Sequence, residues 1–395
     1  MQSSVRHTSH NDVSPAQELQ QMVLDGTKIN YHTDRLAAWE RRCGALAAGL
    51  PAETFAPITI DMALTRKCDA SCWFCYAQLQ ENDRHEITRE VIDGFLQDSA
   101  RMGVRGISLV SDGESLLSPL YVRVIQMGSG LGISMASGTN GRLFNRAKLE
   151  EVLPSLTYLR LNFSAGTPAR YSEIMGFKPE VYDRVCANIR DAVAIKGRRN
   201  LPVTIGMQMV YEPRDADQLL PFAQLAVDLG VDYAVIKHCS DDEYGTLDVQ
   251  YGKYKDTYPL LREAEALSTK QTQVVVKWSK IGDEGRRDYS RCYGPPFLIQ
   301  ISGSGLVAPC GMMFNDRYAK FHIGNICEGR WWDIWKSDRY WEVMGYLASD
   351  NFDARSMCGA LCLQHMVNQA LDGHVKGLQA ITPATGPEPM HLNFV

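Results

Sequence analysis

The sequence predicts an α/β fold, in which a parallel sheet with helical crossovers is followed by a smaller α+β region. From Pro57 to about residue 240, six short β-rich runs alternate with five amphipathic helical stretches. Strands that alternate with helices in this way form right-handed βαβ units and hence a parallel sheet. After about residue 245 the alternation ends, and two apolar arms around Gly303 and Gly305 indicate a hairpin. The 395 residues suffice for two domains, or for one barrel-sized domain with an appendage.

The expected elements of the parallel sheet follow one another in a regular order. The expected strands cover residues 58–64, 106–110, 132–137, 158–163, 203–211 and 232–238. The expected helices between them cover residues 88–103, 119–128, 146–156, 180–195 and 217–230. Each helix has apolar residues at the spacing of one helix face, so each can cover the sheet.

Four units are expected along the chain. An N-terminal extension, residues 1–56, is partly helical, with a helix over residues 34–50 that Asp34 could cap. The main sheet occupies residues 57–245, and a second, smaller domain occupies residues 246–375. That domain would hold a charged helix (254–268), an isolated strand (274–280), the hairpin (297–310) and two further helices (337–348 and 366–375). The proline-rich tail, residues 376–395, is expected to lie extended along the surface.

Composition and charge exclude several classes of protein. The net charge of −5 offers no basic footprint for nucleic acid. No apolar run approaches the ~18 residues of a membrane span, and the N-terminal residues lack the apolar core of a signal peptide. We therefore expect a cytoplasmic protein without nucleic-acid or membrane partners. In such a compartment the eleven cysteines are expected to bind metal or react rather than form disulfides.

Three cysteines lie close together in the loop after the first expected strand. They are Cys68, Cys72 and Cys75, with Phe74 just before the last. Loops at the carboxyl ends of parallel strands carry the chemistry of such sheets. Three thiolates can hold three irons of a cubane cluster and leave one iron open for another ligand. A zinc site completed by His85 is the alternative, although His85 lies in a charged segment.

The spacing Cys-x3-Cys-x-Phe-Cys resembles the motif of the radical SAM superfamily. The resemblance implies a partial (β/α)6 TIM-like barrel with a small C-terminal α+β iron-sulfur domain. It also implies a 4Fe-4S cluster held by Cys68, Cys72 and Cys75, whose open iron binds S-adenosylmethionine. In this family an electron from the cluster cleaves the cofactor to a 5′-deoxyadenosyl radical, which abstracts a substrate hydrogen. A reductant such as flavodoxin or ferredoxin would supply the electron.

The same resemblance implies a set of residues that bind S-adenosylmethionine. The family's Gly-Gly-Glu element, which binds the methionine amino group, corresponds to Asp112-Gly113-Glu114, with aspartate in place of the first glycine. A plain turn is the alternative reading of that segment. Alternation along the fourth strand places its polar side chains inside the barrel, where they are costly unless they bind something. The expected cofactor-binding residues are Phe74, Asp112, Gly113, Glu114, Ser137, Asn140, Arg160, Asn162, Ser164 and Gln208.

A second cysteine pattern lies in the C-terminal region. Cys292, twelve residues, Gly305, four residues and Cys310 resemble the SPASM/Twitch module of many radical SAM enzymes. This resemblance implies one auxiliary 4Fe-4S cluster, with Cys358 and Cys362 as its remaining ligands. Cys327 is a possible ligand in place of either Cys358 or Cys362. Zinc is the alternative metal for this set of cysteines.

Cys239 follows the sixth expected strand, at the mouth of the barrel. It is expected to face the substrate and to return a hydrogen atom to the substrate radical, as cysteines of some radical SAM epimerases do. The alternative is that Cys239 is a thiol of the barrel wall and has no role in the reaction. Lys237, His238 and the two aspartates that follow could equally bind polar groups of the substrate.

Three functions remain open at this point. The first is the modification of a ribosomally synthesised precursor peptide by cross-linking, epimerisation or splicease-type excision. The residues before the barrel are too few for a fused peptide-recognition domain, so a separate recognition protein would deliver the peptide. The second is a dehydrogenase or epimerase of an aminoglycoside or another small polar molecule. The third is a zinc-binding protein without catalysis.

Overall fold

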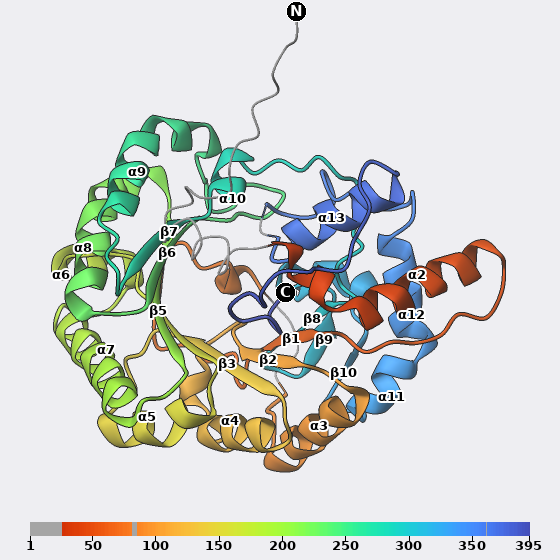
Figure 1. Cartoon of the computed structure of the whole chain (residues 1–395), viewed down its shortest axis with the longest axis horizontal. Coiled ribbons are helices and arrows are strands. Elements are labelled where there is room, and N and C mark those ends of the chain that lie inside the picture. The colour runs from red at the N-terminus through yellow and green to blue at the C-terminus, as the bar shows by residue number, and fades with distance from the viewer. Residues whose placement is uncertain (1–25, 81–84, 361) are drawn as a thin grey trace, which may run out of the picture.

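One continuous sheet organises the computed structural model, which describes residues 26–80, 85–360 and 362–395 (Figure 1). The strand order is β10-β9-β8-β1-β2-β3-β4-β5-β6-β7. All neighbouring pairs from β8 to β7 are parallel, and β9 is antiparallel to both β8 and β10. The sheet curves without closing, and helices α3 to α9 lie on the outside of the curve (Figure 1). This architecture confirms the predicted partial α/β barrel.

The alternation predicted for the first part of the chain is present. The strands are β1 (Thr59–Met62), β2 (Gly106–Leu109), β3 (Ser134–Thr139), β4 (Tyr158–Asn162), β5 (Thr204–Tyr211) and β6 (Tyr233–His238). The helices are α3 (Arg89–Met102), α4 (Tyr121–Gly130), α5 (Arg146–Val152), α6 (Pro168–Met175), α7 (Glu180–Arg199) and α8 (Leu219–Leu229). Short 3-10 helices are η2 (Tyr76–Leu79), η3 (Ser115–Leu117), η4 (Leu153–Ser155) and η5 (Pro213–Gln218).

Helix α6 was not expected from the sequence. It begins with Pro168 in its first turn, where a missing amide hydrogen costs little, and ends at Gly176, whose φ is 69°. The helix is only eight residues long, so its apolar periodicity is weak evidence. Its position after β4 brings its last turn to the three-cysteine loop.

The C-terminal region extends the same sheet. Its elements are η6 (Tyr251–Thr257), α9 (Tyr258–Ala266), β7 (Gln273–Val276), α10 (Trp278–Gly282), β8 (Leu298–Ile301), β9 (Leu306–Ala308), η7 (Gly311–Met313), η8 (Asp316–Phe321), β10 (Gly324–Asn325), α11 (Trp331–Lys336), α12 (Asp338–Leu347) and α13 (His365–Val375). The predicted hairpin is present as β8 and β9, and Gly305 in its turn has a φ of 83°.

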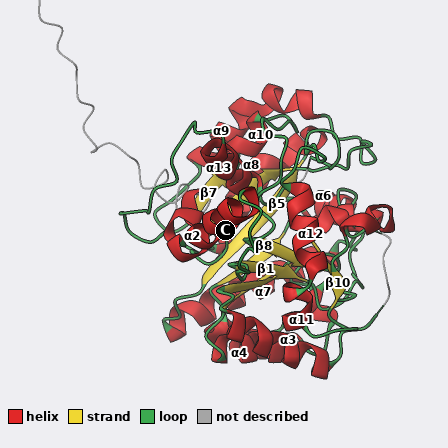
Figure 2. Cartoon of the chain, turned by 90° about the vertical axis from the view of Figure 1, so that its right-hand side faces the viewer, coloured by secondary structure: helices red, strands yellow, loops and turns green. Residues whose placement is uncertain are grey.

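The strand expected to be isolated is not isolated. β7 pairs with β6, and β8 pairs with β1, so hydrogen-bonded strands cross the predicted boundary at residue 245. Unpaired main-chain groups at the edges of β1 and β6 would be costly to bury, and these two strands satisfy them. Figure 2 shows β1 and β8 together in the middle of the molecule. The structure therefore places the C-terminal region as part of the barrel wall.

The N-terminal helix differs from the prediction in its first turn. After η1 (Gly26–Tyr31), α2 (Thr33–Ala47) begins without a side-chain cap. Asp34 lies inside the helix and accepts hydrogen bonds from Arg105 Nη2 at 2.7 and 2.8 Å. The guanidinium groups of Arg105 and Arg35, against an opposing burial effect, lower the pKa of Asp34. The ion pair therefore ties this helix to the sheet.

Most of residues 376–388 are exposed, as predicted for the C-terminal tail, but the last residues of the tail leave the surface and enter the barrel. Asn393 accepts a hydrogen bond from Thr59 Oγ1 at 2.8 Å, and the ring of His391 stacks 4.6 Å from that of Tyr158. The chain end marked C lies inside the ring of strands in Figure 1. A side chain at Gly106 would overlap the Asn393 carbonyl oxygen. The tail therefore covers the amino ends of the strands, where it offers polar partners that solvent would otherwise supply.

Among the described residues, no helix is long and apolar enough to cross a membrane.

If the tail closes this end of the barrel, its aromatic residues should stabilise the fold. We expect Phe394→Ala to lower the free energy of unfolding by about 1–3 kcal/mol, because the ring packs edge-on against Tyr158 at 5.0 Å. Leu378→Ala, at a position 80% exposed, should change it by less than about 0.5 kcal/mol. Urea titration of the three proteins measures the difference. Equal stabilities would show that the tail does not pack in solution.

Candidate active site

A cavity of about 510 Å³ lies inside the curve of the sheet. Side chains from the carboxyl ends of the parallel strands form most of its wall, as parallel sheets predict. The three-cysteine loop after β1 forms one side, and the ends of β6 and β7 with α10 form another. The tail residues His391, Phe394 and Val395 lie at its amino end. The tail therefore lies at the amino end of the cavity, and the three-cysteine loop lies at its carboxyl end.

The three-cysteine loop is held by helix α6. The amides of Ser71 and Trp73 donate to the carbonyl oxygens of Met175 and Ile174, at 3.2 Å each. Gly176 is required here because any side chain would overlap Ser71. These bonds fix the loop between two elements, so its thiols face the cavity in a defined arrangement.

The thiols of Cys68, Cys72 and Cys75 all line the cavity. Burial, with smaller effects of neighbouring acidic groups, raises the pKa of Cys68 to about 11 and raises that of Cys72 further. Thiolates at these positions therefore need a bound metal to stabilise their charge. The ring of Phe74 lies beside them on the cavity wall. These donors fit an iron-sulfur cluster.

The zinc alternative fits less well. Thiolates around a single zinc ion lie about 3.8 Å apart, whereas each thiolate of a cubane binds a different iron. No three His, Cys, Asp or Glu side chains among the described residues are close enough to hold one ion. His85, the expected fourth zinc ligand, lies 3.7 Å from Glu328 instead.

Glu114 is held rigidly on the cavity wall. Its carboxylate accepts hydrogen bonds from Thr139 Oγ1 (2.8 Å), the Leu116 amide (3.0 Å) and the Asn140 amide (2.8 Å). Gly113 before it has a φ of 83°, and a side chain there would overlap the Thr65 carbonyl oxygen. Gly113, Glu114 and Asn140, which were predicted to bind the cofactor, all line the cavity.

Asp112 does not face the cavity, contrary to the prediction. Its carboxylate accepts hydrogen bonds from Ser302 Oγ at 2.6 Å and from the Gly303 amide at 2.9 Å. Arg66 Nε lies 3.4 Å from it. The aspartate that replaces the family's first glycine thus connects the β2 loop to the β8–β9 hairpin. The sequence could not show this because the two segments are 190 residues apart.

Two predicted serines also point away from the cavity. Ser137 lies within β3, which ends two residues later than expected, and its hydroxyl accepts a hydrogen bond from Tyr121 of α4 at 2.8 Å. Ser164 lies beyond the end of β4, where alternation no longer applies, and accepts from the Val210 amide at 3.1 Å. Both side chains are fully buried.

The other residues predicted on β4 and β5 do line the cavity. Arg160, Asn162 and Gln208 are on its wall, and Gln208 Nε2 donates to Asn162 Oδ1 at 3.2 Å. The Nε atom of Arg160 is buried without a hydrogen-bond partner in the described part of the chain. A guanidinium in that state is suited to an incoming carboxylate.

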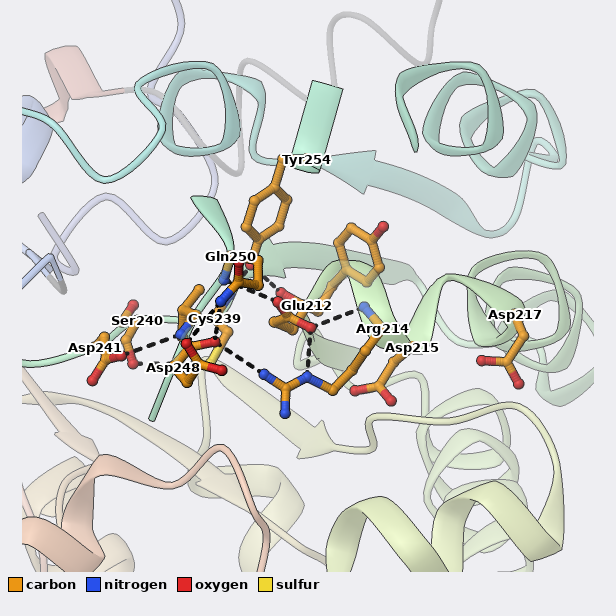
Figure 3. Close-up of polar contacts among 12 residues, drawn as sticks. Glu212, Arg214, Asp215, Asp217, Cys239, Ser240, Asp241, Asp248, Gln250 and Tyr254 are labelled. Carbon is orange, nitrogen blue, oxygen red and sulfur yellow. Dashed lines mark hydrogen bonds and ion pairs between the residues drawn. The ribbon is translucent and has the colours of Figure 1, made fainter. Parts of the chain in front are cut away.

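The prediction that Cys239 faces the substrate is wrong in this structure. β6 ends at His238, so alternation does not extend to Cys239. Its amide donates to the Tyr211 carbonyl oxygen at 2.6 Å and to the Tyr254 hydroxyl at 2.9 Å (Figure 3). The side chain is 0% exposed and is absent from the described cavity wall. Burial, followed by Glu212, raises its pKa to about 12.

Several cavity residues were missed or only mentioned in passing. Asp61 stands in the apolar strand β1, and burial raises its pKa to about 7. Lys277 and Lys280 follow β7 and line the cavity together with Lys237. For Asp61, Lys237 and Lys277, a charged residue inside or directly after an apolar strand was the available signal.

The predicted auxiliary cysteines gather beside the cavity. Asn368 Nδ2 donates to Cys292 Sγ at 3.4 Å and to Cys362 Sγ at 3.9 Å. Burial and then the neighbouring thiols Cys362 and Cys358 raise the pKa of Cys310 to about 12. The four cysteines are therefore close enough to repel one another when ionised, and they suit a bound cluster.

Cys327 lies apart from these four cysteines. Its thiol contacts the carbonyl oxygens of Ser304 (3.7 Å) and Glu86 (3.9 Å), and it lies under the turn at Gly305. His365, expected to be structural, is buried against Tyr289 at 3.1 Å and Asp283 at 2.7 Å. Lys280 Nζ donates to the Cys362 carbonyl oxygen at 2.6 Å and so joins this group to the cavity.

Two family models match the chain in these regions. The model of the radical SAM superfamily matches residues 62–220 and includes the three-cysteine loop. These residues of the chain form a radical SAM domain. The model of the iron-sulfur cluster-binding domain SPASM matches residues 292–362. The cofactors of this radical SAM protein are accordingly S-adenosylmethionine, a 4Fe-4S cluster and auxiliary iron-sulfur.

The curated relatives of this radical SAM protein resemble it over a limited region. A probable GTP 3′,8-cyclase of Saccharolobus islandicus (strain M.14.25 / Kamchatka #1) is 23% identical over 171 residues, which are 43% of this chain and 53% of the relative. Another, from Methanosarcina acetivorans, is 24% identical over 137 residues, 33% of this chain and 40% of the relative. The chain spans about half the length of the curated relatives it matches.

Solved structures share its fold at low sequence identity. Streptococcus suis SuiB bound to S-adenosylmethionine has a TM-score of 0.58 and 16% identity, over 74% of this chain and 68% of that one. Native anSMEcpe with bound AdoMet has a TM-score of 0.56 and 12% identity, over 81% of this chain and 98% of that one. At these sequence identities, the two structures support the partial-barrel fold alone.

The Asp112 contact should be important for stability. We expect Asp112→Ala to lower the free energy of unfolding by about 2–4 kcal/mol, because it removes the buried acceptor of the Gly303 amide and the contact with Ser302. Asp256→Ala, at an exposed position, should cost less than about 0.5 kcal/mol. Anaerobic urea titrations measure both. If the two variants were equally stable, the contact would not hold the hairpin in solution.

Proposed function

We propose that this protein modifies a residue of a ribosomally synthesised peptide by radical SAM chemistry, through cross-linking, epimerisation or splicease-type excision. The observation that carries the proposal is the cavity itself, with three cysteines on one side and four more beside another. When bound, the cluster and S-adenosylmethionine together supply a 5′-deoxyadenosyl radical that can remove a hydrogen atom from a substrate.

We assign each set of cysteines to one cluster. Cys68, Cys72 and Cys75 would hold the 4Fe-4S cluster that binds S-adenosylmethionine, since all three line the cavity. The auxiliary 4Fe-4S cluster would be held by Cys292, Cys310, Cys358 and Cys362. Cys327 is left out of this set because its thiol lies against Ser304 and Glu86.

The remaining cavity residues would bind and orient the cofactor. Glu114, fixed by three hydrogen bonds, can accept from an ammonium group, and Arg160 can bind a carboxylate. The Asn162–Gln208 pair offers amide groups for hydroxyls of a ribose. Phe74 would shield the cluster, and the tail would exclude water from the amino end of the barrel.

The solved relatives support a peptide substrate. SuiB has been crystallised with its precursor peptide SuiA, in a structure with a TM-score of 0.57 and 15% identity to this chain. Native anSMEcpe has been crystallised with the Kp18Cys peptide, at a TM-score of 0.53 and 12% identity. A separate recognition protein would deliver the peptide to this chain, and flavodoxin or ferredoxin would supply electrons.

A small polar substrate is the second candidate. The cavity of about 510 Å³ leaves limited room once a cofactor is bound, and the curated relatives carry the name of an enzyme that acts on GTP. A dehydrogenase or epimerase of an aminoglycoside or similar molecule would fit such a space.

Iron content tests the assignment of the cysteines. After anaerobic reconstitution, the triple change of Cys68, Cys72 and Cys75 to Ala should remove about four irons, and Cys292→Ala with Cys358→Ala should remove about four others. Cys327→Ala is the control and should keep all of them. Zinc in stoichiometric amount without iron would contradict the proposal and support a non-catalytic metal-binding protein.

Mass spectrometry tests the substrate. With S-adenosylmethionine, a reductant and the peptide encoded beside the gene, we expect 5′-deoxyadenosine and a changed peptide mass. The triple cysteine variant should give neither product. An unchanged peptide, together with 5′-deoxyadenosine that forms only when a small saccharide is added, would favour the second candidate.

A further inference from the structure

Three lysines face the cavity from its β6–β7 side. Lys237 is in β6, Lys277 directly follows β7, and Lys280 lies in α10. The register pairs Ile236 with Val276, so Lys237 and Lys277 follow at the same level on neighbouring strands. Three ammonium groups therefore lie on one patch of the wall.

This patch has little compensating negative charge. In the described chain, the side-chain carboxylates on the cavity wall are Asp61 in β1 and Glu114 after β2, and neither lies on β6 or β7. Within those same residues, the side chains of Lys237 and Lys277 have no ion pair or hydrogen bond, whereas Lys280 binds an uncharged carbonyl oxygen at 2.6 Å. Like charges gathered in a partly buried site are unfavourable unless an anion joins them.

The charges also act on one another. Burial, then the positive charges of Arg160 and Lys280, lower the pKa of Lys237 to about 7. Burial and the same neighbours lower the pKa of Lys277 well below its usual value. A bound anion would favour the protonated lysines and remove this mutual repulsion.

We propose that Lys237, Lys277 and Lys280 bind an oxyanion of the substrate, a carboxylate or a phosphate. The positive charge of Lys237 lies close enough to Cys75 to favour its thiolate, and Lys280 Nζ donates to the Cys362 carbonyl oxygen. The three lysines therefore lie between the two groups of cysteines. For the proposed peptide substrate, on which this inference rests, the oxyanion is the carboxylate of an acidic residue near the modified position. A phosphate would indicate the small-molecule candidate.

A competing explanation is that the lysines only offset the charge of the cluster thiolates. That role would require no ligand and would appear in the iron content or in the reduction potentials of the clusters. The two explanations therefore differ in what a lysine substitution changes.

Calorimetry on the reconstituted full chain tests the proposal. The protein, saturated with S-adenosylmethionine so that Arg160 is engaged, is titrated with inorganic phosphate and separately with glutarate, in a buffer free of other oxyanions. We expect one saturable site, weakened about tenfold or more by Lys277→Gln and by Lys237→Gln, because each removes a charge-assisted contact. The Lys277→Arg variant should bind the anion with an affinity within about threefold of that of the unchanged protein.

The matched control is Lys270→Gln, an exposed lysine just before β7, at the other end of the same strand, which should leave the affinity unchanged. Tighter binding of glutarate assigns a carboxylate, and tighter binding of phosphate assigns a phosphate. The proposal is overturned if neither anion binds, or if Lys277→Gln changes only iron content or potentials. Because no turnover is needed, a bound anion with an unmodified peptide would reject the proposed function and leave the subsite intact.

Discussion

The contact of Asp112 with the β8–β9 hairpin is the constraint on which the cavity depends. The buried carboxylate holds Ser302 and Gly303 beside the loop that follows β1, and the parallel pairing of β1 with β8 brings the same segments together. Gly303 can approach the main chain at Thr65 only because it has no side chain, since a Cβ atom there would overlap that main chain. One interaction thus positions the three-cysteine loop, the Glu114 loop and the hairpin that leads to Cys310.

The remaining walls follow from this junction. Helix α6 holds the other side of the three-cysteine loop, and Asn368 of α13 contacts the auxiliary cysteines Cys292 and Cys362. The sign of the charge on the cavity wall differs between its two sides. Glu114 lies on the β2 side, and lysines gather on the β6–β7 side. A ligand that carries both amino and acidic groups would find different partners at each end.

The parts of this arrangement that depend on neighbouring residues could be predicted from the sequence. The cysteine spacing, the alternating strands and helices, and the inward position of Arg160 and Asn162 all follow from local pattern. The errors arise where a local pattern ends. Ser164 and Cys239 lie just beyond strand ends, where alternation no longer decides the direction of a side chain. Asp112 and the tail depend on partners far away in the sequence, which local sequence patterns cannot reveal.

The place of β1 between β2 and β8 affects how the chain folds as it is made. Residues near Ile60 leave the ribosome early and can pair with β2, but the strand on their other side, around Ile299, is synthesised much later. Until then β1 exposes an unpaired edge, the kind of surface through which nascent chains associate. Slow synthesis lengthens that interval, and crowding of many nascent chains makes it more hazardous. The yield of folded protein should therefore depend on expression conditions more than on the stability of the finished barrel.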